Sequence, residues 1–180
     1  ISSKYPTKGF VFFGAYFKAQ QLVVMTVNGL IQGTIPIMSY NYGLGNYKRL
    51  NETLKLSSLI AVILMASGGA ILALFPRQIL RIFMASEEML VFGVPALRIM
   101  TLSYIFNGIS TMIASYMQAI SKVKISIFIN LLRQLLILVS VMWLFNKLFA
   151  MDGIWYSFIV TEVLTCLIAA GFLKKHIITT

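Results

Sequence analysis

The sequence predicts an all-α fold, a polytopic bundle of five membrane-spanning helices. Hydrophobic residues make up 59% of the 180 residues and charged residues only 11%, whereas a soluble domain carries about 25% charged residues. The mean hydropathy is +0.87. The apolar residues gather in long stretches, each sufficient to cross a bilayer as a helix of roughly 20 residues. The expected spans are residues 9–38, 54–75, 89–120, 125–149 and 153–173.

The composition excludes several classes of protein. The net charge is +10, but the basic residues stand singly or in pairs at the ends of the spans, so we expect no nucleic-acid partner. The one cysteine, Cys166, lies in an apolar stretch, so we expect no disulfide and no metal site. The one histidine, His176, and the scattered acids form no cluster. We therefore expect no catalytic residues and no enzyme.

The first span carries a stripe of polar side chains. One helical face presents Gln21, Met25, Asn28 and Gln32. Pro36 removes the backbone hydrogen bond to the carbonyl of Gln32, so we expect a kink or local unwinding there. Free carbonyls beside Asn28 and Gln32 would form a polar patch facing a cavity. The alternative is that these amides only bond neighbouring helices.

The second span is expected to be a scaffold helix. It has no charge after Lys55, and its Ser-Gly-Gly cluster at 67–69 allows close contact between helices. The turn before it, residues 40–49, places aromatic residues at the membrane interface with basic residues behind them. The amphipathic stretch after it, residues 77–83, is expected to lie along the interface.

The third span has one face of small and polar residues. They are Thr101, Tyr104, Gly108, Thr111, Ser115 and Gln118. Asn107 sits beside this face, and Arg98 lies about 10 Å inside the span at 1.5 Å per residue. Tight packing through small residues explains Gly108 well, but it explains Asn107 and Arg98 less well. The face could instead border water.

The last two spans each bring a charge towards the middle of the bilayer. The fourth carries Ser126, Asn130, Arg133 and Ser140 at helical spacing, with Gln134 adjacent. Arg133 lies about nine residues from one end of its span, and Glu162 lies about nine residues from the opposite end of the next. Antiparallel neighbours could therefore pair them near the midplane. An unpaired charge there costs at least about 2.5–3.5 kcal/mol.

This pair has two interpretations. In the first, Glu162 exchanges a proton or binds a cation during transport, and Arg133 adjusts its pKa. In the second, the pair is a permanent bridge that fixes the packing of two helices.

The distribution of basic residues predicts the orientation. Five spans place the termini on opposite sides, and the C-terminal side carries the larger number of basic residues: Lys48, Arg49, Lys55, Lys122, Lys124, Lys174 and Lys175. The other side carries Lys4, Lys8, Arg77, Arg81 and Lys147. We therefore expect a multi-pass protein of the cell membrane with a cytoplasmic C-terminus. Because Ile1 lies in a polar loop that runs at once into a span, we expect a piece of a longer protein.

Several motifs resemble the multidrug and toxic compound extrusion (MATE) family. That family often shows a glycine and a glutamine, then a proline, then Tyr-Asn-x-Gly and a basic loop. Here residues 29–36 read Gly-Leu-Ile-Gln-Gly-Thr-Ile-Pro and residues 40–43 read Tyr-Asn-Tyr-Gly. The resemblance extends from about Gly14 to the C-terminus, through residues 96–99, Gln118-Ala119, Arg133-Gln134 and Glu162.

The resemblance implies five helices, the eighth to the twelfth, of a transporter with two six-helix lobes. Its partners would be the N-terminal lobe, the seventh helix, the lipid bilayer and small organic cations. It would be an antiporter that exports drugs or amphipathic organic cations by alternating access, with a sodium ion or proton as coupling ion and no other cofactor. Candidate pathway residues are Asn28, Gln32, Pro36, Arg98, Asn107, Thr111, Arg133, Gln134 and Glu162.

One departure from the family pattern leaves alternatives open. The family's coupling acids usually lie in its first helix, or in its seventh and tenth, but the span that matches the tenth has no Asp or Glu. We expect Asn107 to occupy that environment, yet an amide does not titrate, which leaves Glu162 as the intramembrane acid. A lipid-linked oligosaccharide flippase of the same superfamily would need more cations than Arg98 and Arg133. A non-transporting structural subunit fits the polar stripes poorly.

Overall fold

The structure is a computed structural model that describes residues 6–83 and 87–177, and their side chains except those of 6–12, 88–89 and 149–152. Helices make up nearly all of these residues, and no strand occurs among them. The predicted all-α membrane bundle is confirmed. The elements are α1 (Pro6–Gly43), α2 (Tyr47–Leu74), α3 (Pro76–Ile82), α4 (Glu87–Thr101), α5 (Tyr104–Ala119), α6 (Val123–Leu131), the π-helical segment η1 (Leu132–Ile137) and α7 (Leu138–His176).

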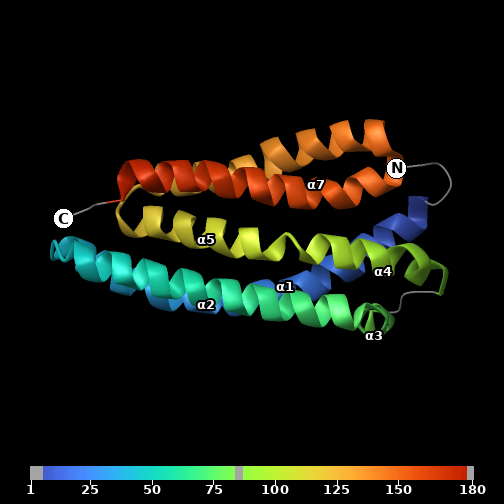
Figure 1. Ribbon diagram of the computed structural model, residues 1–180, viewed down its shortest axis with the longest axis horizontal. Helices are drawn as coiled ribbons and strands as arrows, with labels where there is room; N and C mark the ends of the chain where they lie inside the picture. The colour runs from blue at the N-terminus through green and yellow to red at the C-terminus, as the bar shows by residue number, and fades with distance from the viewer. Residues whose placement is uncertain (1–5, 84–86, 178–180) are drawn as a thin grey trace.

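The long helices lie side by side along one axis (Figure 1). Four described segments are long and apolar enough to cross a membrane, and a fifth is obtained when α4 and α5 count as one bent span. The first part of α7 continues from η1 to one end of the bundle, and the second part returns antiparallel to it (Figure 1). The four segments are Phe13–Gly43, Tyr47–Leu74, Val123–Leu148 and Gly153–His176.

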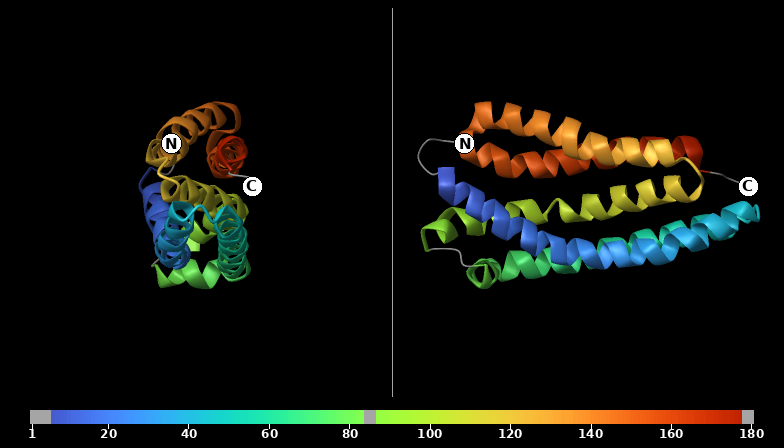
Figure 2. Two further views of the ribbon diagram at one scale, coloured as in Figure 1. Left: turned by 90° about the vertical axis from the view of Figure 1, so that its left-hand side faces the viewer. Right: turned by 180° about the vertical axis from the view of Figure 1, so that it is seen from behind.

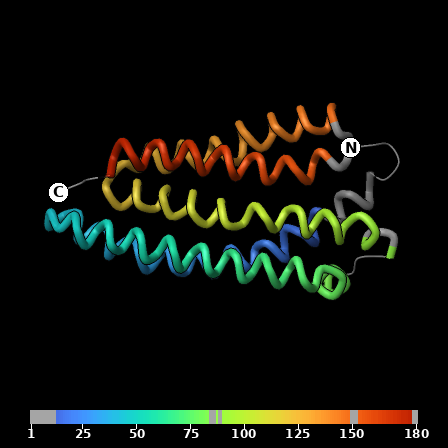
Figure 3. The backbone as a smooth tube through the Cα atoms, in the orientation of Figure 1, coloured from blue at the N-terminus to red at the C-terminus, as the bar shows by residue number. Residues whose placement is uncertain are grey.

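The short helix α3 crosses the end of the bundle. The backbone tube in Figure 3 shows it end-on, while the long helices run across the view. Pro76 opens it, at a position where the absent N–H has no intrahelical partner to lose. Leu80 is buried, and Arg77 and Arg81 are exposed. This is the arrangement expected of an amphipathic helix that lies along the interface.

The third expected span is bent, which its sequence pattern did not reveal. The axes of α4 and α5 differ by 44°. At the break, Ser103 Oγ donates to the carbonyl of Met100 at 2.6 Å, and Thr101 Oγ1 donates to that of Arg98 at 2.9 Å. Serine and threonine hydroxyls that bond to the preceding turn compete with the backbone ladder and favour such a bend.

The first helix stays helical through its proline. α1 runs from Pro6 to Gly43 with Pro36 inside it, so the expected local unwinding is not found. A proline removes only one backbone hydrogen bond, and the bonds on either side hold the helix. Nearby, Thr34 Oγ1 donates to the carbonyl of Leu30 at 2.9 Å.

Small residues of α2 and α5 bring the helices into close contact. A Cβ atom on Gly68 would lie 2.5 Å from Cγ1 of Val23 on α1, and one on Gly69 would lie 3.3 Å from the carbonyl oxygen of Thr101. A Cβ atom on Gly108 of α5 would lie 3.2 Å from Cγ of Met65 on α2. The expected scaffold role of α2 is therefore visible as backbone approach to three neighbouring helices.

Two helix ends at the same end of the bundle close in the same way. After α1, Gly45 has φ +69° and the N–H of Asn46 donates to the carbonyl of Asn41. After α5, Ser121 has φ +63° and the N–H of Lys122 donates to the carbonyl of Met117. Both are Schellman-type ends, in which the left-handed position favours glycine.

Replacing Gly68 by alanine is expected to destabilise the protein. The added methyl group meets a branched side chain held in the α1–α2 contact, and overpacking of this kind costs about 1–3 kcal/mol. Thermal unfolding in detergent should show a lower midpoint for Gly68→Ala, restored in part by adding Val23→Ala. Gly171→Ala is the matched control, because nothing lies within 4 Å of its Cβ position. An unchanged midpoint for Gly68→Ala would contradict the close contact.

Replacing Ser121 by glycine is expected to stabilise the α5–α6 turn. A non-glycine residue in the left-handed region costs about 1–2 kcal/mol, so Ser121→Gly should raise the unfolding midpoint and Ser121→Val should lower it. Gly45→Ala, at the equivalent position after α1, should lower the midpoint. The same thermal unfolding assay measures all three, and a lower midpoint for Ser121→Gly would be the contrary result.

Candidate functional site

A cavity of about 400 Å³ lies between α1, α2, α5, η1 and α7. Its wall contains six of the nine residues that the sequence singled out: Asn28, Asn107, Thr111, Arg133, Gln134 and Glu162. The rest of the wall is formed by Phe17, Gln20, Gln21, Val24, Val27, Met65, Leu138, Phe158 and Thr161. Asn28 and Gln134 are exposed, so the cavity opens to the outside of the bundle.

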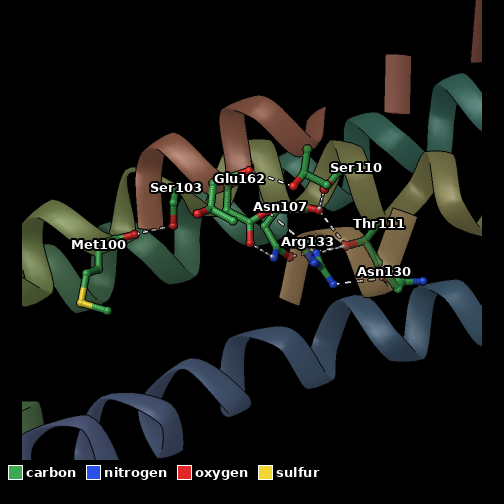
Figure 4. Close-up of polar contacts among 10 residues, drawn as sticks. Met100, Ser103, Asn107, Ser110, Thr111, Asn130, Arg133 and Glu162 are labelled. Carbon is green, nitrogen blue, oxygen red and sulfur yellow. Dashed lines mark hydrogen bonds and ion pairs between the residues drawn. The ribbon is translucent and has the colours of Figure 1, made fainter. Parts of the chain in front are cut away.

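Glu162 is the acid of this cavity. Its side chain, on the returning part of α7, is 13% exposed. Nδ2 of Asn107 donates to its Oε1 at 2.9 Å (Figure 4). Asn107 lies in the first turn of α5, directly after the bend in the third span. A hydrogen bond to a charged group contributes about 1.5–3 kcal/mol, so the amide offsets part of the cost of burying the carboxylate.

Arg133 approaches the same carboxylate from η1. Its Nη1 lies 3.9 Å from Oε2 of Glu162, and its side chain is 14% exposed. Nη1 also donates to Oγ1 of Thr111 at 3.2 Å, and Nη2 donates to Oδ1 of Asn130 at 3.4 Å. The structure thus brings the expected Arg133–Glu162 pair together as an ion pair without a direct hydrogen bond, and Figure 4 shows the two side chains with Asn107 and Thr111 around them.

The π-helical segment positions the arginine. Within η1 the backbone bonds span five residues, as in the bond from the N–H of Leu138 to the carbonyl of Arg133. Arg133 and Gln134 both lie in η1 and both line the cavity. Such segments are rare in helices and occur frequently at functional sites.

Two buried oxygens at the cavity wall have no hydrogen-bond partner among the described residues. They are Oε2 of Glu162 and Oγ1 of the adjacent Thr161. Tyr16 is close enough to Tyr104 and Glu162 to interact with both electrostatically. An unsatisfied buried polar group costs about 1–3 kcal/mol. The site is therefore suited to water or to a ligand that oxygen atoms coordinate.

The cavity combines one carboxylate with aromatic and amide side chains. Phe17 and Phe158 supply apolar faces, and Gln20 and Gln21 supply donors and acceptors. An organic cation with an apolar body could contact the aromatic faces and the carboxylate together. Among the described residues no group of three or more His, Cys, Asp or Glu side chains could hold a metal ion.

Three of the expected site residues do not line this cavity. Gln32 and Pro36 lie further along α1. Nε of Arg98 donates to the carbonyl of Ala73 at 3.1 Å, in the last turn of α2. The last carbonyls of a helix have no intrahelical partner and attract cations, which explains an arginine at this place.

Sequence reasoning missed other residues of the site. Gln20 stands one position before the polar stripe of the first span, and Thr161 resembles any threonine in an apolar segment. Tyr16 gave no signal, because its neighbours Tyr104 and Glu162 come from distant parts of the sequence. Tyr104 could be singled out from the sequence, because it belongs to the polar face of the third span.

Known proteins resemble this chain in sequence and in fold. The sequence profile of the MatE family matches residues 11–144. The multidrug export protein MepA of Staphylococcus haemolyticus is 22% identical over 87% of this chain, and MepA of Staphylococcus aureus strain NCTC 8325 is 24% identical over 88%. The chain spans 34% of the length of each.

Solved structures of MATE transporters superpose on this chain. The MATE multidrug transporter DinF-BH superposes with a TM-score of 0.82 at 30% identity, over 91% of this chain and 37% of the transporter. An outward-facing MATE transporter of the MOP superfamily superposes with a TM-score of 0.89 at 18% identity, over 94% and 39%, which shows a shared fold. Because the family profile covers well over half of the residues, the chain belongs to the MatE family of transporters.

Proposed function

We propose that this chain forms part of the C-terminal lobe of a cation-coupled antiporter that exports drugs or other amphipathic organic cations by alternating access. Rocking of two lobes would expose the cavity to each side of the membrane in turn. The complete transporter would add an N-terminal lobe and a seventh helix. The full-length relatives named multidrug export protein MepA support drug export as the activity.

The observation that carries the proposal is the environment of the Glu162 carboxylate. A carboxylate stands in an apolar bundle, at the wall of an open cavity, with one oxygen bonded by Asn107 and the other without a hydrogen bond from any described residue. Ionisable groups at such depth are costly and are found mainly on substrate and ion pathways. If the Arg133–Glu162 pair were only a structural bridge, we would expect both carboxylate oxygens to accept hydrogen bonds.

The coupling ion would be a sodium ion or a proton, with no other cofactor. The free oxygen of Glu162 could take either one. The hydroxyl of Thr161, which also lines the cavity, would be a further oxygen ligand for sodium or a partner for water in proton transfer.

The charge at the two ends of the bundle supports a cytoplasmic C-terminus in a cell membrane. Seven exposed basic residues gather where α2 and α6 begin and α7 ends, the end that the left view of Figure 2 faces. They are Lys48, Arg49, Lys55, Lys122, Lys124, Lys174 and Lys175. Basic residues accumulate on the cytoplasmic side, where anionic lipids attract them.

The alternatives fit the cavity less well. A lipid-linked oligosaccharide flippase would have to neutralise a phosphorylated carrier, yet Arg133 is the one cation among the described residues of the wall, since Arg98 lies elsewhere. A non-transporting subunit would not explain an open cavity that contains a charge.

Replacing Glu162 by glutamine in the full-length transporter is expected to abolish gradient-driven export. The amide keeps the shape of the side chain and the bond from Asn107 but carries no charge. Ethidium efflux from proteoliposomes, with sodium and proton gradients imposed separately, should fall by about tenfold or more, a loss of at least about 1.4 kcal/mol. The gradient that drives the unmodified protein identifies the ion.

The matched control is Glu52→Gln, which removes an exposed acid of α2 and should leave efflux unchanged. Full efflux by Glu162→Gln would contradict the proposal. Loss of folding, seen as aggregation in size-exclusion chromatography, would instead support the structural bridge.

Cysteine labelling is expected to show the orientation. With Cys166 replaced by alanine, Lys124→Cys should react with a membrane-impermeant maleimide only after cells are permeabilised, because its end would face the cytoplasm. Arg77→Cys, exposed on α3 at the other end, should react in intact cells. The reverse pattern would place the C-terminus outside.

A further inference from the structure

The guanidinium of Arg133 is held by two neutral groups rather than by the acid beside it. Nη1 donates to Oγ1 of Thr111 at 3.2 Å, and Nη2 donates to Oδ1 of Asn130 at 3.4 Å. Nη1 stops 3.9 Å from Oε2 of Glu162. Arginine and carboxylate normally close to about 2.7–2.9 Å and often bond through two pairs of atoms. Here they do not, although both side chains are nearly buried.

The gap leaves one carboxylate oxygen open. Oε1 of Glu162 accepts the amide of Asn107, and Oε2 has no hydrogen-bond partner in the described part of the chain. If Arg133 closed onto Oε2, it would neutralise the acid and occupy the position that a cation needs. The arginine is thus a cation inside the protein that could compete with any cation from outside.

The hydroxyl of Thr111 is placed to prevent this closure. It donates to the backbone carbonyl of Asn107 at 2.7 Å, which turns its acceptor side towards Arg133. The same oxygen lies 3.5 Å from Oδ1 of Asn107, whose Nδ2 donates to Oε1 of Glu162. The hydroxyl of Thr111 therefore contacts both neighbours of the carboxylate, Arg133 and Asn107 (Figure 4).

We propose that Thr111 is a positioning residue for cation binding, which holds Arg133 away from Glu162 and so keeps Oε2 open to the transported or coupling cation. This inference rests on the proposed function of Glu162. Asn130 supports the same position of the arginine as a second acceptor.

The test compares ethidium transport by full-length variants in proteoliposomes. Thr111→Val keeps the shape of the side chain but loses the hydroxyl, so Arg133 should move onto Glu162 and the KM for ethidium should rise. The expected rise is about ten- to a hundredfold, the factor that a hydrogen bond to a charged group supplies. Thr111→Ser keeps the hydroxyl and should restore the KM.

Ser110→Ala is the matched control. Oγ of Ser110 donates to the same carbonyl of Asn107, at 3.1 Å, whereas the side-chain partners of Arg133 among the described residues are Thr111, Asn130 and Glu162. Its loss should leave the KM unchanged. In the Arg133→Gln background the effect of Thr111→Val should disappear, because the competing cation is absent; a purely structural role of the hydroxyl would persist there.

The outcomes separate this inference from the proposed function. If Glu162→Gln abolishes export but Thr111→Val leaves the KM unchanged, or raises it equally with Arg133→Gln, the positioning role is wrong and the proposed function stands. If Glu162→Gln exports ethidium normally, the proposed function fails as well. Should Thr111→Val not fold, Asn130→Leu, at an exposed position, tests the second acceptor and should raise the KM in the same direction.

Discussion

Burial of the Glu162 carboxylate is the constraint on which the centre of this bundle depends. A charge surrounded by apolar helices persists only where hydrogen bonds and an opposite charge compensate its lost hydration. The compensation comes from Asn107 on α5 and from Arg133 on η1, while the acid itself lies on α7. Each of the three side chains would be unfavourable without the others, so these elements must pack together.

Two irregular places in the described spans are next to this cluster. The bend between α4 and α5 comes just before Asn107, and the π-helical turn contains Arg133. A regular helix satisfies its backbone internally, and departures at membrane depth are tolerated where the chain is buried in protein or lines a cavity. The irregular backbone and the polar cluster therefore belong together. The bend and the π-helical turn carry the two residues, Asn107 and Arg133, that compensate the buried charge of Glu162.

The helical bundle and the depth of its charged residues could be predicted from the sequence. The apolar stretches predicted the membrane bundle, and counting residues at a fixed rise placed Arg133 and Glu162 at similar depth. Arg98 shows the limit of such counting, because its depth suggested the pathway while its actual partner is the carbonyl of Ala73. Depth along a helix follows from the sequence, but the direction in which a side chain points around the bundle does not.

The sequence by itself determined that this chain lies in a membrane as helices, because only a helix satisfies its backbone hydrogen bonds within one continuous apolar segment. It also determined which polar residues would be costly there. Only the tertiary structure decided the rest: which hydroxyl bonds Arg133, how close that arginine comes to Glu162, and which carboxylate oxygen has no hydrogen bond from a described residue. These depend on contacts between residues far apart in the chain, at distances of a few ångströms, and periodicity within one helix carries no information about them.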